Sequence, residues 1–211
     1  MADIFDFPQG VRDVAYDDDK GPCMDDDARH STLFRPHGVP DRVWDAVLSV
    51  ERMPRLQGMA YHEIPVPNSM ANFGIGVELE CDDGCPSGWI MVLYSLKFQE
   101  DWHSHWRCVA FASLPMPEKE SKRMEPGMYW ESMMRFLDPD DSEHVSGTVT
   151  VAHNTAFGHD PDAPMAGCEV RVSWTPLDYA DGGLDAGSQV GRWAAFLRSM
   201  TQSEEDVSVD R

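Results

Sequence analysis

The amino-acid sequence predicts an α+β fold, in which a mostly antiparallel sheet of about six strands carries three helices in the order α-β-β-β-β-α-β-β-α. Several segments alternate apolar and polar residues with a period of two, which is typical of strands. Three others space their apolar residues three or four apart, which is typical of helices. Because neighbouring strands are joined by short connections, we expect antiparallel pairing with the helices packed on one face of the sheet.

Length and charge distribution predict one folded domain between two acidic ends. The chain has 211 residues, the size of one domain plus tails. Residues 1–36 carry runs of aspartate among glycine and proline without a sustained period, so we expect an acidic, disordered tail. We expect a single α+β domain over residues 37–202 and a second acidic tail over residues 203–211.

The first predicted elements are a helix and a short strand. Pro40 suits the first position of a helix, and the apolar stripe that follows it ends at Pro54. Met59 to Val66 is extended. Pro65 within it cannot donate to a ladder, so this segment is expected to be an edge strand or to contain a strand's end.

The clearest strands come next. Strict alternation predicts a strand over residues 73–81, with its apolar residues facing the core. Residues 89–94 are apolar on both faces, as expected for a central strand. We expect residues 96–103 to form a polar connection into a fourth strand over residues 104–113.

The remaining segments predict two helices and two strands. A helix with a broad apolar face begins at Pro126 and is stopped by Asp138 and the proline that follows it. Alternation predicts strands around residues 145–151 and 168–174, and helical spacing predicts a last helix over residues 187–200.

Four short strings carry a resemblance to a known family. They are Arg107-Cys108-Val109-Ala110-Phe111, Ser146-Gly147-Thr148-Val149-Thr150, Ala156-Phe157-Gly158 and Ser173-Trp174-Thr175-Pro176. With them, residues 42–202 resemble an uncharacterised actinobacterial family, domain-of-unknown-function family number three thousand. The resemblance implies an intracellular protein. Because that family has no established activity, the resemblance assigns no catalytic residue.

Charge and cysteine content limit which partners and which cellular compartment the sequence is compatible with. The formal net charge of −20 is the wrong sign for binding nucleic acid or an anionic membrane, while a basic protein surface is compatible with it. The sequence shows neither a basic segment followed by an apolar run nor an apolar run of about 18 residues. Five cysteines, an odd number, favour reduced thiols. We therefore expect a cytoplasmic protein with a protein partner, without direct contact with nucleic acid or membrane.

Two groups of residues have metal-binding or catalytic chemistry. Cys81, Cys85, His103 and His105 offer two thiols and two imidazoles, the ligands of tetrahedral zinc, although their spacing differs from the usual zinc patterns and Cys81 also suits the inward side of its strand. The second group lies in the connector between the last two strands and comprises His153, His159 and Asp160. Imidazole and carboxylate groups there suit a divalent ion or an acid/base pair, and the same composition is also that of an ordinary turn.

Motifs for a nucleophile or a nucleotide are absent from the sequence: there is no Gly-x-Ser-x-Gly elbow and no phosphate-binding glycine loop. Gly74 and Gly76 lie inside an alternating strand, where missing side chains let a neighbouring segment pack closely. We therefore expect no cofactor.

The helix after Pro126 is rich in methionine and aromatic residues, which suit either a cover for the sheet or a partner-binding surface that also permits a homodimer. The residues expected at a partner or ligand surface are Trp89, Trp106, Tyr129, Trp130 and Met133.

The resulting functional hypothesis is a non-enzymatic binding or adaptor protein. Two alternatives remain open. One is a small metal-dependent hydrolase that uses the loop at residues 153–162. The other is a small-ligand-binding domain with a pocket between sheet and helices, lined by Trp89, Trp106 and Tyr129.

Overall fold

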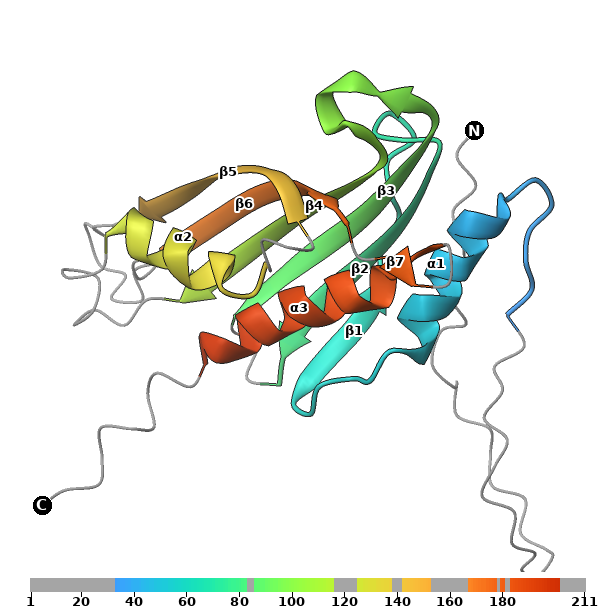
Figure 1. Cartoon of the computed structure of the whole chain (residues 1–211). Coiled ribbons are helices and arrows are strands. Elements are labelled where there is room, and N and C mark those ends of the chain that lie inside the picture. The colour runs from blue at the N-terminus through green and yellow to red at the C-terminus, as the bar shows by residue number, and fades with distance from the viewer. Residues whose placement is uncertain are drawn as a thin grey trace, which may run out of the picture.

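The computed structural model describes residues 33–82, 86–115, 125–137, 142–152, 167–177, 179–180 and 183–201. It contains a six-stranded antiparallel sheet with three α-helices, and it confirms the predicted fold class and element order (Figure 1). The helices are α1 (Asp41–Arg52), α2 (Pro126–Met134) and α3 (Ala186–Ser199), and a 3-10 turn is η1 (Glu100–Trp102). The strands of the sheet are β1 (Met59–Glu63), β2 (Phe73–Cys81), β3 (Ser87–Gln99), β4 (Ser104–Pro115), β5 (Ser142–Ala152) and β6 (Gly167–Pro176).

The strand order in the sheet is β1-β2-β3-β4-β6-β5, so the last two strands exchange places relative to their order in the chain. The strand β1 is an edge strand that ends at Glu63, before Pro65, as predicted. The apolar strand β3 lies in the interior of the sheet, also as predicted. A separate ladder pairs β7 (Tyr179–Ala180) with β8 (Gly183–Leu184); two-residue strands are too short to give a periodic signal.

The connection predicted over residues 96–103 is wrong in part. The strand β3 continues to Gln99, which pairs with Ser104, and only η1 and His103 form the turn. Backbone groups form the ladder, so the exposed Leu96 and Phe98 do not prevent β3 from extending into solvent. Figure 1 shows the resulting hairpin of β3 and β4 projecting beyond the neighbouring strands.

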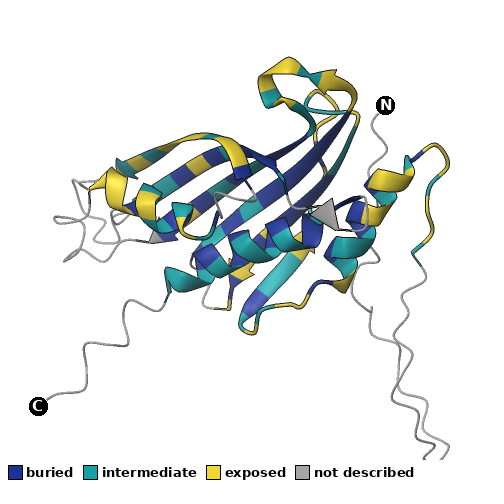
Figure 2. Cartoon of the chain, viewed as in Figure 1, coloured by how far each residue is buried: buried dark blue, intermediate teal, exposed yellow. Residues whose placement is uncertain are grey.

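The three helices lie on one side of the sheet. In Figure 1, α3 crosses in front of β2 and β3, α1 lies beside the N-terminal end of α3, and α2 lies over β5 and β6. Inward residues of the sheet and the helices form one large apolar cluster, in which Trp174 and Trp193 are fully buried. The indole of Trp174 donates to Oε1 of the buried Gln189 at 2.7 Å, which ties α3 to β6. Figure 2 shows that the strands behind α3 are buried along most of their length.

A second, smaller apolar cluster lies on the opposite side of the sheet. The segment after β1 crosses β2 there, and its backbone nitrogen at Ile64 donates to the Gly76 carbonyl at 3.0 Å. A Cβ at Gly76 would lie 2.4 Å from the Ile64 carbonyl oxygen, and one at Gly74 would lie 2.8 Å from Val66. The predicted role of these two glycines, close approach of a neighbouring segment, is therefore confirmed.

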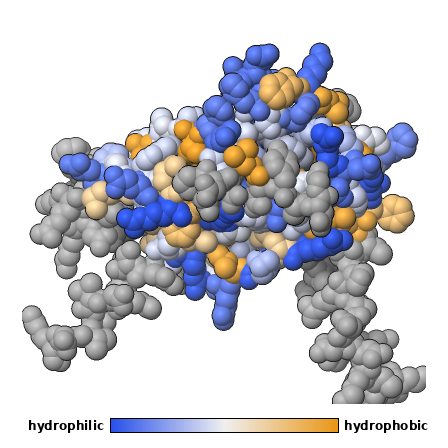
Figure 3. All heavy atoms as spheres, viewed as in Figure 1, coloured by the Kyte–Doolittle hydropathy of each residue, from blue (hydrophilic) through white to orange (hydrophobic). Residues whose placement is uncertain are grey.

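The helix-bearing side of the molecule shows its apolar spheres in small, separate groups among hydrophilic ones (Figure 3). In the part of the chain that the structure describes, no helix has the length and apolar character needed to cross a membrane. The acidic tails predicted over residues 1–36 and 203–211 lie outside the described residues, apart from 33–36.

Candidate binding face of the sheet

We use the name open face for the side of the six-stranded sheet that points away from α1, α2 and α3. Alternation puts every second side chain of each strand on this face. The segment at residues 64–71 and Trp102 of η1 pack over part of it, against Met91 and Leu93. Most other open-face side chains of β4, β6 and β5 are exposed or only half-buried.

One row of the open face crosses all six strands and holds a stacked aromatic pair. The register places its members side by side in the order His62, Glu78, Trp89, Phe111, Arg171 and Thr148. The rings of Trp89 and Phe111 stack with centroids 6.0 Å apart, and Cζ of Arg171 lies 5.5 Å from the Phe111 centroid. Both aromatic residues are half-buried. The Trp89–Phe111 pair is therefore an apolar platform within this row, with the Arg171 guanidinium on one side of it.

Carboxylates lie on the other side of the aromatic pair, toward β2. Glu78 pairs in register with Trp89, and Glu80 is its neighbour along β2 on the same face. Both side chains are exposed, and none of the described residues forms an ion pair with either. By contrast, Glu169 holds Arg171 at 2.6 Å. The β2 side of the aromatic pair is therefore the acidic one.

A polar cluster surrounds Arg107 on the same face, near the edge strand β5. Arg107 is 8% exposed. Its Nη1 donates to the Thr175 hydroxyl at 3.1 Å and to the His144 carbonyl at 3.2 Å. Its Nη2 donates to the Ser173 hydroxyl at 2.7 Å and reaches the Ser146 hydroxyl at 3.5 Å. The guanidinium thus joins β4, β6 and β5.

Burial lowers the pKa of the Arg107 guanidinium from its ordinary value, and Coulombic interaction with Cys108 partly opposes this. An arginine remains charged in spite of such a shift because its ordinary pKa lies far above neutral pH. All partners of Arg107 within the described ranges are neutral oxygens. The cluster therefore holds a positive charge that no described carboxylate offsets.

The sequence alone does not identify Arg107 as a functional residue. Ser146, Ser173 and Thr175 lie on the polar half of alternating strands, which indicates one face but not mutual contact. Arg107 shares its side of β4 with Val109 and Phe111, so its strand gives no such polar pattern. These four residues do belong to three of the strings that carry the family resemblance. That shared membership was the available signal.

The four residues of the predicted zinc site are not brought together in the described structure. Cys81 is buried beside the start of β3, whereas the ring nitrogen Nδ1 of His105 contacts the Ser95 carbonyl at 2.9 Å, near the end of β3. Eight residues of strand separate these points, which is roughly 25 Å. Cys85 lies outside the described residues. No group of three potential ligands suited to a metal occurs among the residues that the structure describes.

His103 instead contacts His144, a residue outside the predicted zinc site. Its imidazole stacks on that of His144, with centroids 4.5 Å apart and an interplanar angle of 10°. Both residues have a φ of 49°. His103 ends η1 in the turn between β3 and β4, and His144 lies in β5 where its pairing with β6 changes register. The pair adjoins the Arg107 cluster, because the His144 carbonyl accepts a hydrogen bond from Arg107.

The catalytic alternative involves His153, His159 and Asp160, all of which lie outside the described residues. It stays a prediction.

The five residues expected at a partner or ligand surface do not share one surface. Trp106, Tyr129 and Met133 are buried in the large apolar cluster, where they join the sheet to α2. Trp130 is half-buried against the same cluster, close to Gly147 of β5. Trp89 alone lies on the open face. The pocket expected from Trp89, Trp106 and Tyr129 is therefore not formed by these residues, because alternation puts Trp89 on the opposite side of the sheet.

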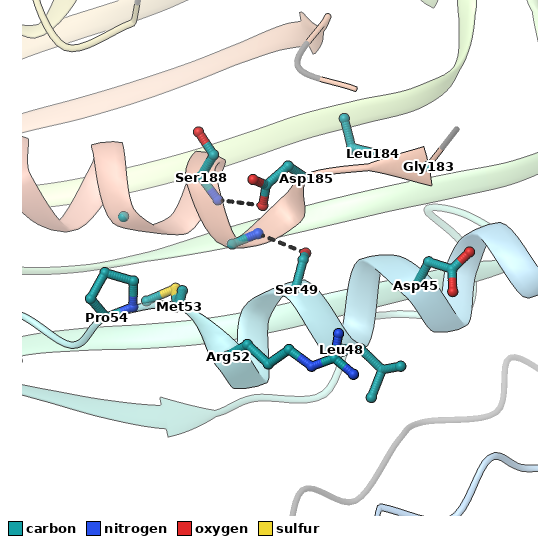
Figure 4. Close-up of a pocket in the computed structure, with 12 residues that line it drawn as sticks. Asp45, Leu48, Ser49, Arg52, Met53, Pro54, Gly183, Leu184, Asp185 and Ser188 are labelled. Atoms are coloured by element: carbon teal, nitrogen blue, oxygen red, sulfur yellow. Dashed lines mark hydrogen bonds between the residues drawn. The ribbon is translucent and has the colours of Figure 1, made fainter. Parts of the chain in front are cut away.

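A groove of about 630 Å³ lies between α1 and α3 (Figure 4). Two of its polar side chains, those of Ser49 and Asp185, have structural hydrogen bonds. The Ser49 hydroxyl accepts from the Gly187 backbone N–H at 3.0 Å and donates to the Ala46 carbonyl at 2.7 Å. Asp185 accepts from the Ser188 N–H at 2.9 Å and so caps α3. We therefore assign a structural role to both side chains, helix packing for Ser49 and helix capping for Asp185.

Comparisons with known proteins identify a family but no activity. The sequence model of a family described as "Protein of unknown function (DUF3000)" matches residues 39–203. No curated protein and no solved structure matches the chain.

Proposed function

Because the chain belongs to the DUF3000 family, whose description names no activity, we propose from the geometry of the open face that it is a binding protein for a basic segment of a partner protein. This keeps the binding or adaptor role expected from the sequence and places it on the open face. The row containing Trp89 and Phe111 is the observation that carries the proposal. We also propose that the protein acts in the cytoplasm, because the three described cysteines are free thiols.

The aromatic pair supplies the apolar part of the proposed interface. Aromatic residues held in a rigid setting contribute large contact area at a low cost in side-chain entropy, and tryptophan is enriched among residues that dominate binding energy. Trp89 and Phe111 are held by stacking on each other and by strand pairing on both sides. The proposed partner therefore inserts an apolar or long basic side chain against this pair.

Charge complementarity supports a basic partner. The chain has a formal net charge of −20, and Glu78 and Glu80 lie exposed beside Trp89. A lysine or arginine of the partner can lay its methylene stem on the indole and place its cation at Glu78. Long-range attraction would also speed the encounter, and added salt would weaken it.

The test is capture of partners from native lysate, identification of the captured protein, and measurement of its affinity by titration calorimetry with purified protein. We expect the double variant E78Q/E80Q to weaken binding about fivefold, since exposed ion pairs contribute roughly 0.2–1 kcal/mol each. We expect Trp89→Ala to weaken it at least thirtyfold, as loss of about 2 kcal/mol at an interface centre would.

The matched control is the double variant E125Q/E131Q, which removes the same charge from exposed residues at α2, on the helix-bearing side. Urea unfolding of Trp89→Ala separates loss of binding from loss of folding. A captured protein whose affinity is reduced equally by E78Q/E80Q and E125Q/E131Q would contradict a site on the open face.

A further inference from the structure

We infer that the Arg107 cluster is a binding site for an oxyanion, a phosphate or carboxylate group held by the Arg107 guanidinium and the hydroxyls of Ser146 and Ser173. This site lies in other rows of the open face than Trp89 and Phe111, and it does not depend on the proposed basic partner.

Arg107 is a buried cation without a counter-ion among the described residues. Burying a cation is costly unless an anion or several good hydrogen bonds offset the loss of water. Arg107 is 8% exposed, and the oxygens it contacts among the described residues are two hydroxyls, a more distant third hydroxyl and one carbonyl. An oxyanion would supply the missing negative charge, and guanidinium groups bind phosphate and carboxylate in a planar fork.

The hydroxyl groups beside Arg107 have at least one hydrogen that can be donated to a ligand. The Thr175 hydroxyl donates to the Trp102 carbonyl at 2.6 Å, so its hydrogen is engaged. The Ser146 and Ser173 hydroxyls lie 3.4 Å apart, and at most one of them can donate to the other. At least one hydroxyl hydrogen is thus left for a ligand, beside Nη2 of Arg107.

On the solvent side of the cluster, the contacts of the Ser146 hydroxyl are long. The contact of Ser146 with Nη2 is 3.5 Å and that with Ser173 is 3.4 Å, both at the long limit for a hydrogen bond. Ser146 is exposed on the edge strand β5, whereas Ser173 holds Nη2 at 2.7 Å. A ligand oxygen entering from β5 can receive hydrogen bonds from Nη2 and from both serines, in place of these two long contacts.

An internal carboxylate is the competing occupant. Glu143 pairs in register with Thr175 and so lies in the row of the cluster, but its carboxylate approaches Nε2 of His144 at 3.9 Å and forms no ion pair with Arg107. Its side chain is 57% exposed. The variant Glu143→Gln distinguishes an external oxyanion from this internal one.

The test uses NMR titration of the full chain with inorganic phosphate, and separately with acetate, against sodium chloride at equal ionic strength. We expect saturable shifts of the backbone amides of Arg107, Ser146 and Ser173 with phosphate. Saturation by acetate as well would assign a carboxylate-tolerant site, and saturation by phosphate alone would assign a phosphate site; both support the proposal. Shifts that do not saturate with either anion, or that chloride reproduces, would overturn it.

Two variants make the test specific. S146A/S173A is expected to weaken phosphate binding about tenfold through the loss of two hydroxyl donors, while S113A/T150A, exposed hydroxyls elsewhere on the open face, leaves it unchanged. Equal affinity of S146A/S173A and wild type would overturn the proposal. Glu143→Gln is expected to strengthen phosphate binding without lowering the melting temperature of the ligand-free protein. A lowered melting temperature would identify Glu143 as the counter-ion of Arg107 and would also overturn it.

Discussion

Cys108 and Cys168 lie on neighbouring strands, β4 and β6, on the side of the sheet that the helices cover. Burial raises the pKa of Cys168 from about 9 to about 11, and Coulombic interaction with Glu169 adds to the shift. Burial also raises the pKa of Cys108 well above its ordinary value, although Coulombic interaction with Arg107 opposes this. Since the thiolate is the reactive form, these two thiols are protected in the folded protein.

These shifts predict that stability falls in alkaline solution. Between about pH 9 and pH 11 the Cys168 thiol ionises in the unfolded chain but stays protonated in the fold, so rising pH favours unfolding. Each thiol contributes a slope of at most about 1.4 kcal/mol per pH unit. Urea unfolding of wild type and of C108A/C168A from pH 7 to pH 10.5 measures this slope. We expect the double variant to lose stability less steeply above pH 9, and parallel curves would contradict the shifts.

At the scale of elements, α1 and α3 cross at a glycine. A Cβ at Gly187 would lie 2.4 Å from the Ser49 carbonyl oxygen and 3.1 Å from the Met53 side chain. Gly191, one turn further along α3, has no atom within 4 Å of such a Cβ. The two glycines therefore differ in packing while sharing one helix.

This difference predicts opposite effects of the same substitution. Gly187→Ala should destabilise the protein by about 2 kcal/mol because the helices must separate. Gly191→Ala should stabilise it by about 0.5–1 kcal/mol because alanine loses less backbone entropy in a helix. Urea unfolding of both variants measures the two free energies. Destabilisation of similar size in both would show that helix packing at Gly187 is not the cause.

The elements themselves were largely predictable from local pattern. The strict alternation from Phe73 to Cys81 predicted β2, and Pro65 predicted the end of β1. The extension of β3 to Gln99 was not predictable, because its last side chains are exposed and its pairing depends on β4 rather than on a buried face.

The candidate site was less predictable than the fold. Alternation identifies Ser146 and Ser173 as outward residues of two strands, but it does not give the spatial order β4-β6-β5 that puts them in contact with Arg107. For the same reason the sequence does not show that Trp89 and Trp106 lie on opposite faces of the sheet.

At the scale of the whole molecule, the two sides of the sheet differ in kind. One side is covered by three helices over the large apolar cluster. The other carries the aromatic row, the exposed Glu78 and Glu80, and the Arg107 cluster. A net charge of −20 would repel acidic partners from the molecule as a whole, so a basic partner fits this arrangement best. We therefore propose that recognition takes place on the open face.

Hydroxyl-radical labelling with mass spectrometry tests whether the partner binds the open face. The labelling is compared between the free protein and its complex with the captured partner. We expect Trp89 and Phe111 to be labelled in the free protein and protected in the complex, while Trp193, which is fully buried, stays unlabelled in both. Met128, exposed on α2, should be labelled equally in both. Protection of Met128 with unchanged labelling of Trp89 and Phe111 would contradict the account.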